Sequence, residues 1–229
     1  MNAPQLPAGS ATYSDYVFDR LRADIVSGDI APKAKLAMKT LCERYRVGMS
    51  PVREALHRLV GEGFVQLVGQ RGFTVPPLSL EDLEDLTALR VLVEEAAVRQ
   101  AIARGDDAWE AGIVAAFHRL ERQVGRIADT SDEAVRRYDA VHRGFHMALY
   151  AGVSSSRLAA LHANLFDQAF RYRKTLHGTP LDPAEVLAEH RKLMDRVLSR
   201  DADAAVASLC GHLRLTREST QRFLTMQTA

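Results

Sequence analysis

The sequence predicts a mainly α-helical protein, in which a small mixed N-terminal domain precedes an antiparallel all-α bundle. Three observations lead to this fold class. The segments before Pro76-Pro77 are short and combine helical with strand patterns. The two prolines fit neither a helix interior nor a central strand, so they mark a boundary. Every later segment repeats apolar residues at helical spacing, and no strand pattern follows.

Three helices are predicted in the N-terminal domain, over about 14–27, 38–45 and 51–62. Each repeats apolar residues on one face, as a helix that packs on a core does. Ser50 is a natural N-cap for the third helix. Pro51 suits its first position, where the missing N–H costs nothing.

Two short strands are predicted next, over 64–68 and 73–75, joined by the hairpin at 69–72. Helix, short helix, turn, helix and hairpin follow one another in the order of a winged helix-turn-helix. The sequence therefore predicts such a domain over residues 14–77, after a disordered tail over residues 1–13.

Residues 78–229 are predicted to form one helical domain of about 150 residues. The breaks between its helices carry glycine, proline, serine or aspartate. The six predicted helices cover about 79–104, 107–128, 131–151, 155–176, 182–200 and 202–224.

Composition is that of a soluble globular protein, with 47% hydrophobic and 26% charged residues. The sequence contains neither an apolar run of membrane-spanning length nor a secretory signal, so we expect a cytoplasmic protein. In that compartment Cys42 and Cys210 are expected to be reduced thiols. Residues 1–77 carry 10 basic and 7 acidic side chains, a net charge of +3, while residues 78–229 carry 20 and 22, a net charge of −2. This mild asymmetry is compatible with an N-terminal domain that faces phosphates.

Four of the eight histidines are placed as metal ligands would be. His142 and His146 are four residues apart, so they share one face of a helix, and His190 and His212 lie on two later helices. Imidazole nitrogens suit Zn, Ni or Cu, and side chains from three bundle helices can converge on one cavity. Ordinary buried or surface histidines are the alternative. The remaining four are expected to be surface or packing residues: His57, His118, His162 and His177.

Two sets of motifs resemble a known family of bacterial transcription regulators, the GntR family. The run PVREALHRL at 51–59, followed by EGFV at 62–65 and RGFTV at 71–75, resembles the family's DNA-binding domain. Leu89-Arg90 with Glu94, Phe145-His146, Glu189-His190 and His212 resemble the FCD effector domain of its FadR-type subfamily. Together these matches cover nearly the whole chain from about residue 14. The resemblance implies a homodimer that binds double-stranded, palindromic operator DNA.

The helix that starts near Ser50 is expected to enter the major groove, where base edges carry a distinct hydrogen-bonding code. By resemblance, Lys39 and Arg53 match positions that contact DNA in the family. The family commonly has Ser-Arg in the turn where Gly48 and Met49 stand here, so an arginine suited to reading guanine is missing and the operator sequence does not carry over. The predicted DNA contacts are Lys39, Arg44, Arg46, Ser50, Arg53, Arg58, Arg71 and Gly72.

The resemblance also implies a metal site. FCD domains hold a metal with an aspartate, a histidine four residues later and two further histidines; His146, His190 and His212 match the three histidines. His142 stands at the aspartate position, and Asp139, one turn earlier, is the alternative ligand. Such a set favours a nitrogen-preferring ion, Zn or alternatively Ni, over Mn or Mg.

A small carboxylate is the expected effector, since a metal with open positions takes one carboxylate oxygen and a guanidinium binds a second carboxylate. Arg90, at the family's Arg-x-x-x-Glu position with Glu94, is the first candidate, although an ion pair between the two is equally compatible. Arg171 and Arg173 are second candidates. Segments at 103–111, 142–146 and 165–173 resemble a family member associated with repression of glutarate and GABA catabolism genes, and this likeness favours a small carboxylate, for example a dicarboxylate such as glutarate.

These features predict a ligand-responsive regulator, most simply a repressor of a catabolic operon, and not an enzyme. The alternative is a metal-dependent hydrolase or lyase built on the histidines. Against it, the sequence has no H-E-x-x-H motif, no nucleophile elbow and no obvious general base beside the histidines. A DNA-binding protein without an effector is a third hypothesis.

Overall fold

The computed structural model describes residues 11–69, 72–126, 131–174 and 182–228. The chain divides into two compact units. The first contains Met1–Ser79 and Phe170–Lys174, and the second contains Leu80–Ala169 and Thr175–Ala229. None of the described helices combines the length and the hydropathy that a membrane span requires.

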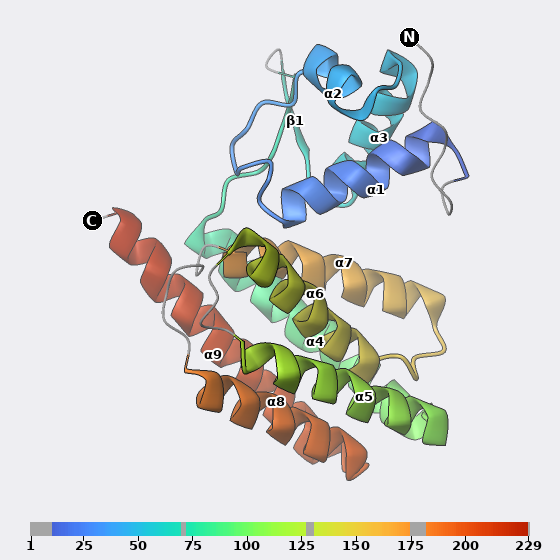
Figure 1. Ribbon diagram of the computed structural model, residues 1–229, viewed down its shortest axis with the longest axis vertical. Coiled ribbons are helices and arrows are strands. Elements are labelled where there is room, and N and C mark those ends of the chain that lie inside the picture. Colours follow the sequence, from blue (N-terminus) through green and yellow to red (C-terminus); the bar gives the residue numbers. More distant parts are fainter. Residues whose placement is uncertain (1–10, 70–71, 127–130, 175–181, 229) are drawn as a thin grey trace. The chain divides into compact units, whose positions relative to one another are not determined.

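The first unit has the predicted winged helix-turn-helix order (Figure 1). Its two strands pair antiparallel, with Leu67 opposite Phe73, and an isolated bridge from Lys35 to Thr74 extends the pairing. The elements are α1 (Tyr13–Val26), α2 (Met38–Tyr45), α3 (Met49–Gly61), β1 (Gln66–Val68) and β2 (Gly72–Thr74).

Helix α1 begins one residue earlier than predicted. The Thr12 hydroxyl accepts a hydrogen bond from the Asp15 N–H at 3.1 Å, which satisfies one of the unpaired donors of the first turn. Thr12 and Tyr13, expected in the tail, are therefore the cap and the first residue of a helix. Val17 and Leu21 are fully buried on its inner face, where α1 packs against α3.

The prediction that Ser50 caps α3 is wrong. Gly48 is the N-cap, without a side-chain hydrogen bond, and the helix starts at Met49. Arg46 closes α2 in the left-handed conformation, with φ 56°, and this turn brings the chain into helical geometry before Ser50. Pro51 is then the third residue of the helix, where its N–H would still lack an intrahelical acceptor.

The described residues of the second unit form helices joined by turns and loops, with no strand among them, as predicted (Figure 1). Helix α5 ends at Val124, four residues before its predicted end, because Gly125 caps it. The last turn of α7 belongs to the first unit, which contains Phe170–Lys174. The helices are α4 (Leu80–Arg104), α5 (Asp107–Val124), α6 (Asp132–Leu149), α7 (Ser156–Arg173), α8 (Pro183–Leu198) and α9 (Ala202–Thr228).

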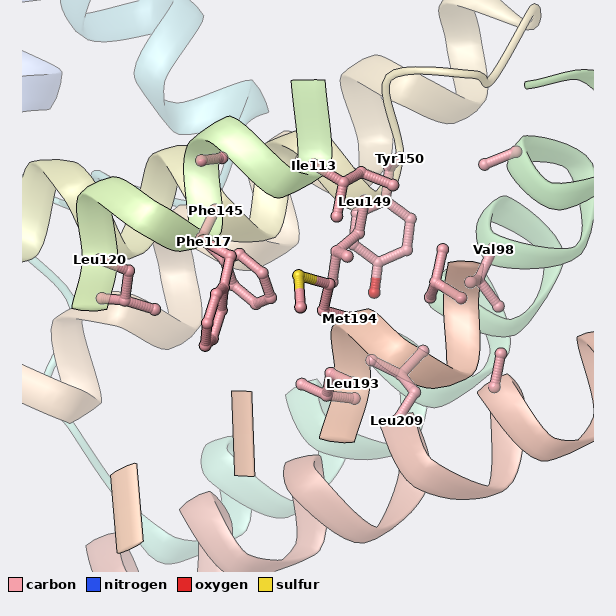
Figure 2. Close-up of a cluster of buried hydrophobic side chains, with 14 of the residues drawn as sticks. Val98, Ile113, Phe117, Leu120, Phe145, Leu149, Tyr150, Leu193, Met194 and Leu209 are labelled. Atoms are coloured by element: carbon pink, nitrogen blue, oxygen red, sulfur yellow. The ribbon is translucent and has the colours of Figure 1, made fainter. Parts of the chain in front are cut away.

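One large apolar core holds this unit together (Figure 2). Ile113 of α5 and Phe145 of α6 are fully buried, and the rings of Phe117 and Phe145 meet edge to face at 5.8 Å. Leu193 of α8 and Leu209 of α9 complete this core from the other side. Each such side chain contributes about 1.5–3 kcal/mol by leaving water. The core thereby fixes α6 and α8, the helices that carry three of the candidate ligands.

Candidate functional site

Three of the predicted DNA contacts project from the helix-turn-helix into solvent. Lys39 of α2, Arg46 of the turn and Arg53 of α3 are all exposed. Within the part of the chain that the structure describes, no carboxylate pairs with any of them. Their positive charges are therefore available to phosphates or base edges.

Arg44 and Arg58 are exposed in part but already paired. Arg44 lies 2.7 Å from Asp24, and Arg58 donates to Asp15 at 2.8 Å. The Arg58 guanidinium also lies 4.1 Å from the centre of the Phe18 ring, and its hydrogen bond lowers the pKa of Asp15. These contacts tie α2 and α3 to α1, so phosphate binding by either arginine would compete with an internal ion pair. Their role at DNA stays a prediction.

Further predicted contacts lie at the start of α3 and in the wing. Ser50 is exposed in the first turn of α3, beside Met49, whose side chain is 58% exposed. Met49 thus presents an apolar group at the helix end expected to approach the bases. Gly72 has φ +75°, a conformation that disfavours any larger residue at this end of the wing. Arg71 lies outside the described residues.

Three of the four predicted metal ligands converge in the second unit. His142, His146 and His190 each offer a ligand atom, and these atoms all lie within 4.8 Å of one another. The Nε2 atoms of His142 and His146 are 3.2 Å apart, as their spacing on α6 predicts. All three side chains are at most 5% exposed.

The surroundings of the cluster suit a metal. The Nδ1 atom of His190 lies 2.6 Å from the Val186 carbonyl; donation to this oxygen directs the Nε2 lone pair toward the cluster. The ring of His212 on α9 lies 5.2 Å from that of His146 and 5.1 Å from that of His190, next to the triad but not part of it. Asp139 is buried one turn before His142 and is also not part of it. Three buried imidazoles fit a transition-metal ion.

A buried polar network lies in the same unit. Arg90 donates to Glu94 from Nε at 2.8 Å and pairs with it through Nη2 at 2.7 Å. The Tyr150 hydroxyl donates to the other carboxylate oxygen at 2.6 Å. Burial and the neighbouring carboxylate raise the pKa of Tyr150, which keeps the hydroxyl protonated as the donor. The predicted Arg90–Glu94 ion pair is therefore present, and Tyr150 is a member that the sequence did not reveal.

Residues of α7 extend this network and were not predicted. His162, expected at the surface or in packing, is 2% exposed, and its ring lies 3.9 Å from that of Tyr150. Its Nε2 is buried without a hydrogen-bond partner among the described residues. The Phe166 ring lies 5.5 Å from the Arg90 guanidinium and 5.3 Å from the His146 ring. Phe166 is therefore next to both the histidine cluster and the Arg90 network.

Arg143, which is half-buried, and Asp167, which is buried, form a second ion pair. The guanidinium donates to both carboxylate oxygens, at 2.7 and 3.1 Å, and Asp167 is 4% exposed. The two partners are 24 positions apart in the sequence, so no local spacing rule applies and helical periodicity could not predict this pair.

Arg171 and Arg173 belong to the last turn of α7, which is grouped with the first unit. Arg171 is buried and donates to the Pro76 carbonyl at 2.9 Å. Arg173 is half-buried, with its guanidinium 5.8 Å from the centre of the Phe170 ring. The two arginines therefore belong to a different unit from the polar network around Arg90. Their role as effector ligands stays a prediction.

The buried His162 should make the stability of the protein depend on pH. Burial lowers its pKa from 6.5 to about 4. Between these values the unfolded chain binds a proton that the folded chain does not, so stability present above pH 6.5 is lost as the pH falls toward 4. From pH 7.5 to pH 5 the loss is about 2 kcal/mol.

Urea unfolding at both pH values measures this effect. His162→Phe should lose about 2 kcal/mol less than the parent protein over the same interval. His118→Gln, at an exposed position, should behave as the parent does. An identical pH dependence in His162→Phe and the parent would contradict the assignment.

A model described as "Bacterial regulatory proteins, gntR family" matches residues 13–75, and a model of the FCD domain matches residues 85–215, more than half of the chain. The chain belongs to the GntR family. The predicted resemblance is thus confirmed for both domains.

Relatives of this GntR-family regulator cover most of its length. It is 38% identical to the uncharacterized HTH-type transcriptional regulator BphR of Paraburkholderia xenovorans, over 90% of this chain and 84% of the relative. It is 36% identical to the HTH-type transcriptional repressor GlaR of Escherichia coli, over 84% of this chain and 89% of the relative. Its fold is similar to that of E. coli McbR/YncC, with a TM-score of 0.76, 21% identity, and 96% and 100% of the two chains covered.

These matches settle the class of function. The protein is a DNA-binding transcription regulator with an FCD effector domain, and its family and relatives are regulators, not enzymes. The hydrolase or lyase hypothesis is therefore not supported. The histidine cluster and the Arg90 network lie in the unit that contains most of the residues matched by the FCD model.

Proposed function

We propose that this regulator is a homodimeric repressor of a catabolic operon, released from its operator by a small carboxylate bound beside a divalent metal in the FCD domain. The observation that carries the proposal is that three buried imidazoles and a buried guanidinium lie close to the same ring, that of Phe166. Apolar side chains would pack a helical core at lower cost, because burying imidazole and guanidinium groups without binding partners costs free energy.

His142, His146 and His190 would hold the metal, and His212 or Asp139 would complete the set. Zn suits this donor set best, with Ni as the alternative. The bound ion would supply a positive charge and open positions for a carboxylate oxygen. The protein would present the three imidazoles to the metal in a buried site. The hydrogen bond from His190 Nδ1 to the Val186 carbonyl favours this, because it leaves the Nε2 lone pair to bind the ion.

Arg90 would select a second carboxylate on the same effector. Of the five N–H donors of its guanidinium, Glu94 engages those on Nε and Nη2. The others would bind a carboxylate at the end remote from the metal. A short dicarboxylate such as glutarate would satisfy both positive groups at once, whereas a monocarboxylate would satisfy one.

At the DNA end, α3 would enter the major groove with Arg53 toward the bases, while Lys39 and Arg46 would contact phosphates. A dimer would place two such helices on the half-sites of a palindromic operator. An effector that binds more tightly to one arrangement of the dimer shifts the population toward it, which is the proposed route of release.

Calorimetric titration of glutarate into metal-stripped and zinc-loaded protein tests the sensor. We expect binding by the loaded form and at least a 10-fold weaker binding by the stripped form. His146→Ala should lose both zinc-dependent thermal stabilisation and glutarate binding, while His118→Ala, at an exposed histidine, should keep both. Equal glutarate binding by the two forms would overturn metal-mediated recognition. Binding of a monocarboxylate as tight as that of glutarate would overturn the role of Arg90.

A further inference from the structure

A large apolar side chain is exposed at the start of α3. Met49 is 58% exposed, more than any other large hydrophobic side chain among the described residues of the first unit. It is the first residue of the helix, directly after the N-cap Gly48. A Cβ built on Gly48 would have no described atom within 4 Å beyond its chain neighbours. Met49 therefore projects from a helix end that the rest of its unit does not cover.

The groups that flank Met49 along the chain are basic. Arg46 lies three residues before it, and Arg53 lies four residues after it, one helical turn further along the same face of α3. Both are exposed, and among the residues that the structure describes neither is paired with a carboxylate. The two arginines suit phosphates and polar base edges. Met49, which lies between them in sequence, has no charge and no hydrogen-bond donor, so it needs a different partner.

We propose that Met49 contacts the C5-methyl group of a thymine in each operator half-site. This rests on the proposed entry of α3 into the major groove, and it names a base that the start of the helix selects. Base pairs present hydrogen-bond donors and acceptors in that groove, and the apolar group among them is the thymine methyl. Polar base edges would lose water against the Met49 side chain without gaining a hydrogen bond, whereas a methyl group gains an apolar contact.

The chemistry of methionine and the place of Met49 both favour this partner. Its unbranched thioether chain has three rotatable bonds, so it can adjust to a methyl group whose position is fixed by the DNA. Because Met49 is exposed in the unbound protein, its apolar surface leaves water only on binding, and that burial contributes to affinity for DNA and not to folding. The basic neighbours of Met49 disfavour an apolar protein surface as its partner, because their charges would be buried with it.

Replacing thymine with deoxyuridine, which removes only the C5-methyl group, tests this contact. The parent protein first selects operator duplexes from a randomised pool, and each thymine is then replaced in turn. We expect one thymine in each half-site at which the replacement weakens binding about 4-fold, the effect of returning one methyl-sized group to water. Selected operators without a required thymine would overturn the proposal.

Variants of Met49 assign the effect to this side chain. Met49→Ala should bind the thymine and deoxyuridine duplexes equally, while Met49→Leu, which keeps a large apolar chain, should retain a preference for thymine. Leu67→Ala is the matched control, because Leu67 is 55% exposed but lies on β1; it should keep the preference of the parent. A preference that persists in Met49→Ala would overturn the proposal, since another side chain would then contact the methyl group.

Arg53→Ala separates this inference from the proposed role of α3. It should weaken binding to the thymine and deoxyuridine duplexes alike. If Arg53→Ala loses operator binding but no deoxyuridine replacement affects the parent, α3 enters the groove and the inference about Met49 alone is wrong. If Arg53→Ala and Met49→Ala both bind as the parent does, the placement of α3 is wrong as well.

Discussion

Replacing Arg53 with alanine is expected to abolish specific operator binding, with a loss of affinity of about 100-fold toward the level of non-specific DNA. Arg53 is exposed in the first half of α3, and no carboxylate pairs with it in the part of the chain that the structure describes. A bidentate arginine contact to a base contributes roughly 1–3 kcal/mol of discrimination, and the lost charge weakens phosphate binding as well.

A gel-shift titration at fixed salt measures this loss. Arg119→Ala removes the same charge from an exposed position on α5 and should bind operator as the parent does. Thermal unfolding should be unchanged in both variants, since neither side chain is buried. If Arg53→Ala bound operator with the affinity of the parent, α3 would not be the recognition helix.

Replacing Arg90 with methionine should destabilise the second unit by roughly 3–5 kcal/mol. Glu94 is 2% exposed, and its charge is compensated by Arg90; among the residues that the structure describes, the Tyr150 hydroxyl is its one further donor. Without the guanidinium the carboxylate would be buried with a single hydrogen bond. The double variant Arg90→Met, Glu94→Gln removes both charges and should recover most of the loss, because a neutral amide still accepts from Tyr150.

Urea unfolding of metal-stripped protein compares these variants without the contribution of a bound ion. Arg137→Met breaks a pair of the same local spacing, with Glu133, in which the side chains are 53% and 76% exposed. It should cost less than about 1 kcal/mol. Similar losses for Arg90→Met and Arg137→Met would mean that the Glu94 carboxylate is not dependent on its arginine.

The main features of both domains could be predicted because they depend on local order. The apolar spacing of each helix, the hairpin glycines and the proline pair act over a few residues. The spacing of His142 and His146, and of Arg90 and Glu94, likewise follows from one helical turn, and the structure has both pairs in contact. The misplaced cap at Ser50 shows the limit even locally. The left-handed conformation of Arg46 in the preceding turn decided where α3 starts.

The sequence by itself determined the family, the helices and the local pairs along each of them. Only the tertiary structure decided that His190 meets the pair on α6, that Tyr150 reaches Glu94 across 56 residues, and that His162 is buried beside them. The physical reason is that helical periodicity states which side of a helix is apolar. It does not state which other helix will cover a given polar group on that side, and that choice depends on how all the helices share one core.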